Sequence, residues 1–469
     1  MQVTGARPKI TVTAGGKGVV GHAGARLLAD LAGATGLTGQ FSQALAGLRQ
    51  RDSGHDPGRV AVDLAVMIAD GGEAIADLAV LRGQAELFGP VASDATAWRV
   101  LDGTDTEALV RLRAARAAAR EVAWAQRYET RGGFPVSRAA HRPVPGLVLD
   151  LDASIVVCHS EKEQADKTWK KSFGFHPLFC FLDNTGEALS GLLRTGRAGS
   201  NTTADHISVL DEALAQIPDV HRFGTPILIR ADTAGGTYGF LAHIRSLRQQ
   251  GVDACFSVGV PITEPIRAAI SAVPDEVWCP ALDADGEVRD GAQIAELTGL
   301  VEAQLLANYP PGTRVIVRRE RPHPGAQLDL FDTINGMRHQ VFATDTIAGS
   351  LQYLEVRHRA HARVEDRIRC GKQTGFGRFP SRVFAINTVW LELALTGIDL
   401  LAWTQLLLLL DGELATAEPK RLRYRLLHVA ARITRSARRT RLRIAAGWPW
   451  AAALVAAFTR LAALPRPAT

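Results

Sequence analysis

The chain has 469 residues, of which 46% are hydrophobic and 22% are charged. This composition is ordinary for a globular protein and excludes wholesale disorder, and the length predicts two or three domains. The formal net charge is +6, but residues 357–443 contain 18 lysine and arginine residues against seven acidic ones, which indicates a polyanionic partner such as nucleic acid.

Residues 1–142 are predicted to be a helical N-terminal domain, because apolar residues recur at spacings of three and four with alanine between them. A plain helical bundle is one interpretation of this domain. The other is a module that binds DNA ends through arginines on an exposed face, namely Arg111, Arg113, Arg116 and Arg120. Segment 131–146 is rich in glycine, proline and arginine, which is typical of a linker.

Residues 143–260 change to β-branched runs that alternate with amphipathic ones. Strands are predicted at 146–159, 175–183 and 187–196, followed by a helix at 202–217, a strand at 225–233, a helix at 236–251 and a strand at 252–260. The order β-β-β-α-β-α-β predicts an α/β fold whose mixed sheet is covered by helices.

The alternation of strands and helices stops after residue 260. Residues 261–345 are predicted to form a β-rich insertion subdomain, with short strands at 277–282, 313–322 and 338–346. Helices are expected to resume over 346–411. Residues 412–469 are predicted to be a basic helical tail, because ten lysine and arginine residues and no acidic residue occur between positions 420 and 443.

The five cysteines are widely spaced and form no Cys-x-x-Cys pair, so neither a disulfide framework nor a zinc knuckle is expected. A reducing cytoplasm is therefore the expected location, and a DNA-binding protein there is expected to be associated with the nucleoid. Two apolar stretches, 383–410 and 448–464, are interrupted by polar or charged residues. They favour buried helices over membrane spans, so no membrane association is expected.

Acidic residues mark a candidate site on the predicted sheet. Asp150 and Asp152 are two positions apart on one strand and therefore share a face. Two carboxylates in an apolar strand are costly unless they are paired or bind a cation, so metal binding is favoured over a solvated strand edge. Asp232 ends another strand, where α/β proteins bind ligands, although an Asp there could also serve as a helix N-cap.

A third element carries His358, His361, Glu365 and Lys372 at helical spacing, which places them on one stripe. The simpler interpretation of Glu365 is a surface residue in a salt bridge. Three carboxylates on one core nevertheless offer the hard oxygen ligands that Mg²⁺ or Mn²⁺ prefers, and two such ions could act on a phosphodiester. The His-x2-His-x3-Glu pattern is a poor zinc site, because no cluster of cysteines or further histidines lies nearby to complete four ligands.

These features resemble the RNase H-like catalytic core of DDE transposases: the order of elements, the acid on the first strand, the acid after the fourth and the glutamate on a later helix. The β-rich insertion resembles bacterial insertion-sequence transposases that have a Tyr-x2-Arg-x3-Glu-x6-Lys signature. In this chain the same spacing joins His358, His361, Glu365 and Lys372, so two histidines replace Tyr and Arg. The runs GFHPLFCF and LLRTGRAGSN also look like this family.

The resemblance implies a catalytic triad of Asp152, Asp232 and Glu365, because the Asp-x-Ser motif of the family fits Asp152 and Ser154. Asp150 would be a neighbouring metal ligand. The implied reaction is Mg²⁺- or Mn²⁺-dependent cleavage at the element ends, followed by strand transfer into target DNA in a cut-and-paste pathway, by a homodimer that binds the terminal inverted repeats. The residues expected to contact DNA are His358, Arg359, His361, Arg363, Lys372, Arg421, Arg423, Arg438 and Arg439.

Trp278 lies in the predicted insertion. If cleavage passes through a DNA hairpin, this side chain could stack on an extruded base. The alternative is that Trp278 belongs to the core of the insertion.

A short segment in the insertion indicates a protein partner. It consists of Gln327, Leu328, Asp329, Leu330 and Phe331, and it resembles the pentapeptide by which bacterial replication proteins dock on the β sliding clamp. The alternative is that Leu330 and Phe331 fill the core of the insertion itself.

Two other functions compete with transposition. Asp150, Asp152 and Ser154 also resemble the Asp-x-Asp-x-Thr/Ser motif of haloacid-dehalogenase-type phosphatases, although that fold requires a parallel sheet. The non-enzymatic alternative is a transposase relic that binds DNA without cutting it.

Overall fold

The central element is a ten-stranded mixed sheet in which distant parts of the chain meet. The computed structural model describes residues 10–14, 16–49, 54–159, 161–322, 333–437 and 439–466. The first five long strands of the sheet are β4 (Leu147–Ala153), β8 (Leu178–Leu182), β9 (Ala188–Leu192), β10 (Ile227–Ala231) and β11 (Ala254–Val260). They lie in the order β9-β8-β4-β10-β11, with β4, β10 and β11 parallel and β8 and β9 antiparallel to their neighbours. The predicted mixed α/β fold and its order β-β-β-α-β-α-β are confirmed.

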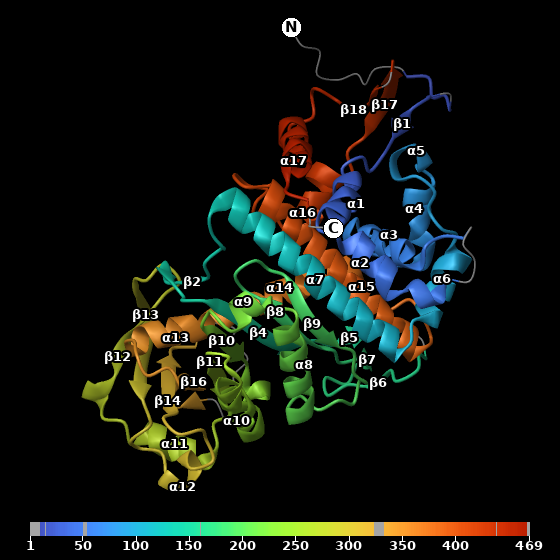
Figure 1. Cartoon of the computed structure of the whole chain (residues 1–469). Helices are drawn as coiled ribbons and strands as arrows, with labels where there is room; N and C mark the ends of the chain where they lie inside the picture. Colours follow the sequence, from blue (N-terminus) through green and yellow to red (C-terminus); the bar gives the residue numbers. More distant parts are fainter. Residues whose placement is uncertain are drawn as a thin grey trace.

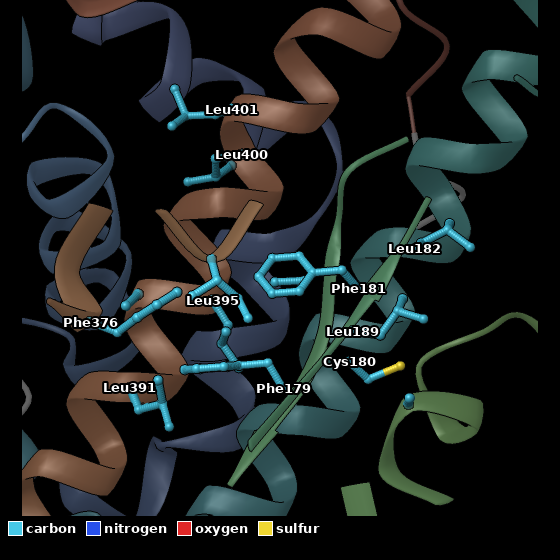
Figure 2. Close-up of a cluster of buried hydrophobic side chains, with 14 of the residues drawn as sticks. Phe179, Cys180, Phe181, Leu182, Leu189, Phe376, Leu391, Leu395, Leu400 and Leu401 are labelled. Atoms are coloured by element: carbon cyan, nitrogen blue, oxygen red, sulfur yellow. The ribbon is translucent and has the colours of Figure 1, made fainter. Parts of the chain in front are cut away.

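Helices cover both faces of this sheet. The helices that join the strands are α8 (Thr203–Ala215), α9 (Asp219–Arg222) and α10 (Tyr238–Ser246). Ser190 of β9 points to α8 and donates to Val209 O, whereas the next residue, Gly191, faces Leu395 of α15 (Phe384–Trp403). Figure 2 shows Phe179 and Phe181 of β8 on the α15 side of the sheet, with Cys180 and Leu182 on the other. This alternation explains why the apolar strands are buried on both faces.

A small excursion separates β4 from β8. It forms a three-stranded antiparallel sheet in the order β5-β7-β6, from β5 (Val156–Val157), β6 (Asp166–Lys167) and β7 (Phe173–Phe175). The first strand predicted from the sequence, 146–159, is therefore two strands. The break follows Asp152, so the chain leaves the main sheet at the candidate site.

The insertion extends the main sheet. Its strands are β12 (Cys279–Leu282), β13 (Val288–Glu296), β14 (Arg314–Glu320), β15 (Thr333–Ile334) and β16 (Met337–Thr344), and its helices are α11 (Glu264–Ser271) and α12 (Ala303–Leu306). Strand β16 pairs antiparallel with β11 of the core. Strand β13 has no counterpart in the sequence-based prediction, because charged residues and a glycine interrupt its apolar pattern.

Helices resume after the insertion, as predicted. They are α13 (Leu351–Arg359), α14 (Arg363–Gly371) and α15, and α15 continues to Leu408. The segment Phe384–Leu408 is long and apolar enough to cross a membrane, but 78% of its most apolar window is buried inside the protein. It is a core helix, which agrees with the interpretation of this stretch from the sequence.

The N-terminal helices share one core with the C-terminal part of the chain. They are α1 (Ala25–Ala34), α2 (Leu37–Ala44), α3 (Pro57–Ala69), α4 (Ala79–Arg82), α5 (Ala85–Phe88), α6 (Asp94–Gly103) and α7 (Thr106–Arg131). Helix α3 packs along α15, and α1 contacts α17 (Ala451–Ala463). Figure 1 shows the N-terminal helices (blue) and the C-terminal segments (red) gathered at one end of the molecule, with the insertion at the other. The predicted linker contains a short hairpin, β2 (Arg138–Ala139) and β3 (Arg142–Pro143).

The basic C-terminal segment is only partly helical, contrary to the predicted helical tail. After α16 (Pro419–Leu422) it forms an antiparallel hairpin of β17 (Ala431–Ser436) and β18 (Arg439–Ile444), and β17 also pairs with β1 (Val19–Val20). Alternation of arginine with apolar residues in this region follows the period of a strand, which the sequence analysis missed beneath the density of charge.

The arginines of α7 correct a second prediction. Arg116 and Arg120 are 1% and 0% exposed, so they cannot form an exposed DNA-binding row. Arg120 donates to Glu187 and Asp399, and Arg116 donates to the backbone of β9 and faces Glu392. These contacts join α7 to the edge of the sheet and to α15. The polar stripe of α7 is therefore an internal ion-pair network.

Replacement of Arg120 by methionine is expected to lower the free energy of unfolding by about 3–5 kcal/mol, because it leaves Glu187 and Asp399 buried without their cation. Urea denaturation followed by circular dichroism measures the change. The matched control on the same helix is Arg111→Ala, whose side chain is 50% exposed and whose loss should cost at most about 1 kcal/mol. Equal effects of the two substitutions would contradict the assignment of Arg120 to a buried network.

Candidate active site

Three carboxylates from three elements meet at one edge of the main sheet. Asp152 lies near the end of β4, Asp232 directly follows β10, and Glu365 lies in the first turn of α14. Strands β4 and β10 are parallel neighbours in a register that pairs Leu151 with Ala231. The two aspartates therefore leave the sheet side by side, at the carboxyl edge where α/β folds hold ligands.

Of the three carboxyl groups, that of Asp152 is half-buried, whereas those of Asp232 and Glu365 are exposed. Burial is the largest cause, and together with the nearby carboxylates of Asp232 and Glu365 it raises the pKa of Asp152 to about 7, despite the opposing effect of His361. Repulsion among three neighbouring carboxylates would be relieved by a cation bound between them. The donor set therefore fits one or more divalent ions with hard oxygen ligands.

Asp232 and Glu365 are exposed and line a cavity of about 620 Å³ between the end of the sheet and the α13–α14 segment. Thr233, His358 and His361 line the same cavity. Asp232 also accepts a hydrogen bond from Ala234 N at 2.9 Å, so the capping role weighed from the sequence is present as well. One oxygen makes the turn, and the other is free to take part in the site.

The three carboxylates do not form a tight cluster around a single point. Among the described residues, only one group of three possible metal ligands has its ligand atoms within 4.8 Å of one another, and it lies elsewhere in the molecule. Asp232 and Glu365 line the cavity, and Asp152 lies close enough to both for their charges to raise its pKa.

Asp150 is not available to a metal, which corrects the prediction that it is a ligand. It is 0% exposed, and its two oxygens accept from Arg230 Nε at 2.7 Å and Arg230 Nη2 at 2.8 Å. Burial opposes its ionisation, but Arg230 and His361 outweigh burial and lower the pKa of Asp150 to about 2. The phosphatase alternative fails on the same observations, because a paired carboxylate cannot act as its nucleophile and β8 next to β4 is antiparallel.

The two histidines of the stripe are mainly structural. His361 Nδ1 lies 3.0 Å from Asp150 Oδ1, which fixes the ring at the floor of the cavity. His358 stacks on Phe342 with the ring centroids 4.4 Å apart, and burial followed by His361 lowers its pKa to about 3. A neutral, stacked His358 offers no charge to a phosphate, so its predicted DNA-binding role is not supported by its surroundings.

Lys372 lies near Asp152 but is not among the residues that line the cavity. Its amine donates to Ile155 O at 2.9 Å, just after β4. Burial and Lys170 lower the pKa of Lys372, whereas Asp152 raises it, so the lysine and the first acid interact. Lys372 directly follows α14, the helix that carries Glu365, and its expected contact with DNA stays a prediction.

The predicted DNA-binding arginines divide into three groups. Arg423 is 8% exposed and donates to Ala69 O, Gln373 O and Thr374 Oγ1, so it is an internal tie and not a DNA contact. Arg359 and Arg363 form ion pairs with Glu355 and Asp183 but keep part of their surface. Arg421 and Arg439 are exposed, and Arg438 lies outside the described residues.

Trp278 is 7% exposed and packs in the main core, with the guanidinium of Arg319 4.1 Å from its ring. The core alternative is therefore correct in this structure, and the ring is not presented for stacking on a base. The sliding-clamp segment, Gln327 to Phe331, lies outside the described residues.

The sequence analysis missed Arg230, although the strand that carries it holds a signal. A single arginine interrupts the apolar run Ile-Leu-Ile-Arg-Ala of β10. A charge at the centre of a buried strand requires a partner, and Asp150 is the residue directly opposite in the register.

Comparison with known proteins identifies the family. The family model described as Transposase DDE domain group 1 matches residues 2–466. Among solved structures, the chain is similar to the piggyBac transposase in a synaptic complex with hairpin DNA, at 9% identity and a TM-score of 0.42, over 86% of this chain and 80% of that chain. No curated protein matches the sequence. DDE transposases use divalent metal ions to cleave DNA and transfer its strands, which agrees with the carboxylate site. The chain belongs to the DDE transposase family, and it is an enzyme of DNA transposition.

Proposed function

We propose that Asp152, Asp232 and Glu365 are the catalytic carboxylates of this transposase and that they hold two Mg²⁺ or Mn²⁺ ions. The observation that carries the proposal is their meeting from β4, β10 and α14 at one edge of the sheet, close enough for Asp232 and Glu365 to raise the pKa of Asp152. When bound, the ions would activate the attacking water or 3′-hydroxyl and stabilise the leaving oxygen of the phosphodiester.

The protein groups around the carboxylates position the reacting DNA. Lys372 places a cation beside Asp152, where it can contact the phosphate next to the cleaved bond. His361 is held by Asp150 at the floor of the cavity and sets its depth. Asp232 and Glu365 are exposed at the mouth, so a DNA backbone can reach both without a change in the fold.

The C-terminal hairpin offers a surface for the DNA backbone. Arg432, Arg439, Arg441 and Arg443 are exposed, and the register sets Arg432, Thr434 and Ser436 directly opposite Arg443, Arg441 and Arg439. These residues therefore share one face, while Ile433 and Leu442 pack toward the core on the other. A row of exposed arginines can contact successive phosphates of the DNA backbone. Phosphate contacts do not distinguish one base from another, so this contact is expected to be independent of DNA sequence.

Further features of the pathway follow from the chemistry of synapsis. Two element ends require two active sites, so we expect a homodimer on the terminal inverted repeats and cut-and-paste transposition. The docking of Gln327–Phe331 on a β sliding clamp stays a prediction, as do the bacterial origin and the location near the nucleoid. A catalytically silent relic would bind the element ends but leave them uncut.

Glu365→Gln is expected to reduce cleavage of the DNA that flanks its reading frame by at least about 100-fold, because a lost metal ligand removes several kcal/mol of transition-state stabilisation. Gel analysis of the end-cleavage products in Mg²⁺ measures the rate, and a filter-binding assay should show unchanged DNA affinity. Asp366→Asn removes the adjacent exposed carboxylate of the same helix and serves as the control, with a rate close to that of the wild type. Equal cleavage by wild type and Glu365→Gln would remove Glu365 from the mechanism.

The Mg²⁺ requirement is expected to depend on pH, because a proton on Asp152 competes with the metal and the pKa of this carboxyl is raised to about 7. At a pH above this value the carboxylate is ionised and can bind metal. Below it, each decrease of one pH unit should raise the Mg²⁺ concentration that gives half-maximal cleavage, by a factor that approaches about ten. Titration of cleavage with Mg²⁺ at several pH values between pH 6 and pH 8 would measure this change, which Mn²⁺ should reproduce at lower concentrations. A half-maximal concentration that is constant over this range would contradict the proposal.

Replacement of Arg439, Arg441 and Arg443 by alanine is expected to make the negative slope of log affinity against log salt shallower by about 2.7, since each lost phosphate contact on duplex DNA accounts for about 0.9. Fluorescence anisotropy with labelled duplexes at several salt concentrations measures the slope. The control is Arg435→Ala, because Arg435 lies in the same hairpin but is 3.5 Å from Glu86. An unchanged slope in the triple variant would show that the hairpin does not contact the backbone.

A further inference from the structure

A second cluster of potential metal ligands lies where the N-terminal and C-terminal segments meet. It consists of His22, Asp70 and His428, whose ligand atoms all lie within 4.8 Å of one another. These residues belong to the segment after β1, to the end of α3 and to the segment before β17. The carboxylates of the active site are in different elements, so this cluster is a separate feature of the fold.

The contacts within the cluster converge on the carboxylate of Asp70. His22 Nδ1 lies 2.5 Å from Asp70 Oδ2, and His428 Nε2 lies 3.3 Å from Asp70 Oδ1. The two imidazole rings are 4.3 Å apart between their centroids. His428 Nε2 also lies 2.8 Å from the backbone oxygen of Asp70, so one nitrogen of each histidine lies against this one residue.

The carboxylate at the centre is buried and incompletely satisfied. The side chain of Asp70 is 4% exposed, and the one contact that its Oδ1 makes among the described residues is the 3.3 Å ion pair with His428 Nε2, which is not a well-formed hydrogen bond. A buried carboxylate oxygen that is incompletely paired is costly, so a cation at this point would stabilise it. His22, Asp70 and His428 also line a cavity of about 490 Å³, whose other charged residues are Glu73, Asp77 and Arg378, and the cavity leaves room for an ion and its water.

The backbone holds the three ligands in place. Val19 and Val20 of β1 pair with β17, and the contact continues as Ala23 N donates to Val429 O and Gly24 N to Leu427 O. A Cβ at Gly24 would lie 1.8 Å from Leu426 O, so only glycine permits this close approach beside His22. Asp70 is fixed as the C-cap of α3. Ligands on rigid elements lose little freedom on binding, which favours metal affinity.

We propose that His22 Nδ1, Asp70 and His428 Nε2 bind a divalent transition-metal ion, with Zn²⁺ the best fit. Mixed imidazole and carboxylate ligands suit Zn²⁺ rather than Mg²⁺. Bonds of about 2.0–2.1 Å in tetrahedral geometry separate ligand atoms by roughly 3.3 Å, so a small outward shift of the His22 ring opens the site. Water from the cavity, or Glu73, completes the fourth position.

The ion fastens the C-terminal segment to the N-terminal helices. His428 directly follows the helical turn Arg423–Leu427, and Arg423 links that turn to Ala69 O next to Asp70 and to Gln373 O beyond α14. Loss of the metal is therefore expected to loosen the attachment of the arginine hairpin without disturbing the carboxylates of the active site.

The test uses the untagged full-length chain, stripped with a chelator, in an Asp232→Asn and Glu365→Gln background that removes the ligands of the active site. Titration with Co²⁺, followed by its visible absorption, and equilibrium dialysis with Zn²⁺ should both show one bound equivalent. His22→Asn and His428→Gln should each weaken Zn²⁺ binding by more than about 100-fold. Loss of a residue that only supports a ligand typically costs about 10–100-fold, and loss of the ligand itself should cost more. Both replacements keep a polar group near the displaced nitrogen, so the fold is expected to persist, as circular dichroism would verify.

The matched control is His243→Ala. His243 Nε2 lies 2.7 Å from Asp211 in a histidine–aspartate pair of the same chemistry outside the cluster, and its loss should leave the bound equivalent intact. Zn²⁺ should also raise the melting temperature of the background protein and of His243→Ala, but not that of His428→Gln. Absence of Co²⁺ and Zn²⁺ binding in the background protein, or retention of the equivalent in His428→Gln, would overturn the proposal and leave a metal-free hydrogen-bonded network.

Discussion

The ion pair between Asp150 and Arg230 is the interaction on which the active site depends. Both side chains are 0% exposed, and they lie opposite each other on the adjacent parallel strands β4 and β10. Two buried charges are tolerated only when the geometry is bidentate and the remaining atoms are satisfied, as they are here by His361 and by Arg357 O. Asp152 and Asp232 each follow a member of the pair by two residues, so the pair sets their relative position. It also draws the α13–α14 segment onto the sheet, which brings Glu365 to the same edge.

The arginines of this protein act in two physically different ways. Arg116, Arg120, Arg230 and Arg423 are buried and tie elements together through carboxylates and carbonyl groups. The hairpin arginines are exposed on one face of a ribbon whose other face is apolar. The first group stabilises the arrangement that holds the site, and the second is available to a polyanion. Net charge therefore overstates the surface that can contact DNA.

The two proposed metal sites differ in their ligands and in the role proposed for the ion. The carboxylates at the sheet edge are oxygen donors in an open cavity, which suits ions that exchange water and contact a phosphate. The cluster of His22, Asp70 and His428 offers nitrogen and oxygen donors between segments that are distant in the chain, which suits an ion that fastens them. Each set contains a carboxylate that a cation would stabilise, because the pKa of Asp152 is raised by burial and by its acidic neighbours and because Asp70 is buried with one oxygen incompletely paired.

The sequence by itself determined the order of the core elements and the places where acidic residues fall on them, because apolar periodicity and strand ends are local properties. It offered Asp150, Asp152, Asp232 and Glu365 as candidate acids, and the family resemblance favoured Asp152 over Asp150. Only the tertiary structure decided which charged residues are buried. Asp150 and Asp152 are equivalent in the sequence pattern, but Arg230 stands opposite one of them alone. Arg120 became internal because Glu187 and Asp399 face it from elsewhere in the chain. His22, Asp70 and His428 form no motif, since strand pairing between the two ends of the chain brings them together. The identity of a partner across such distances depends on packing, which no local pattern encodes.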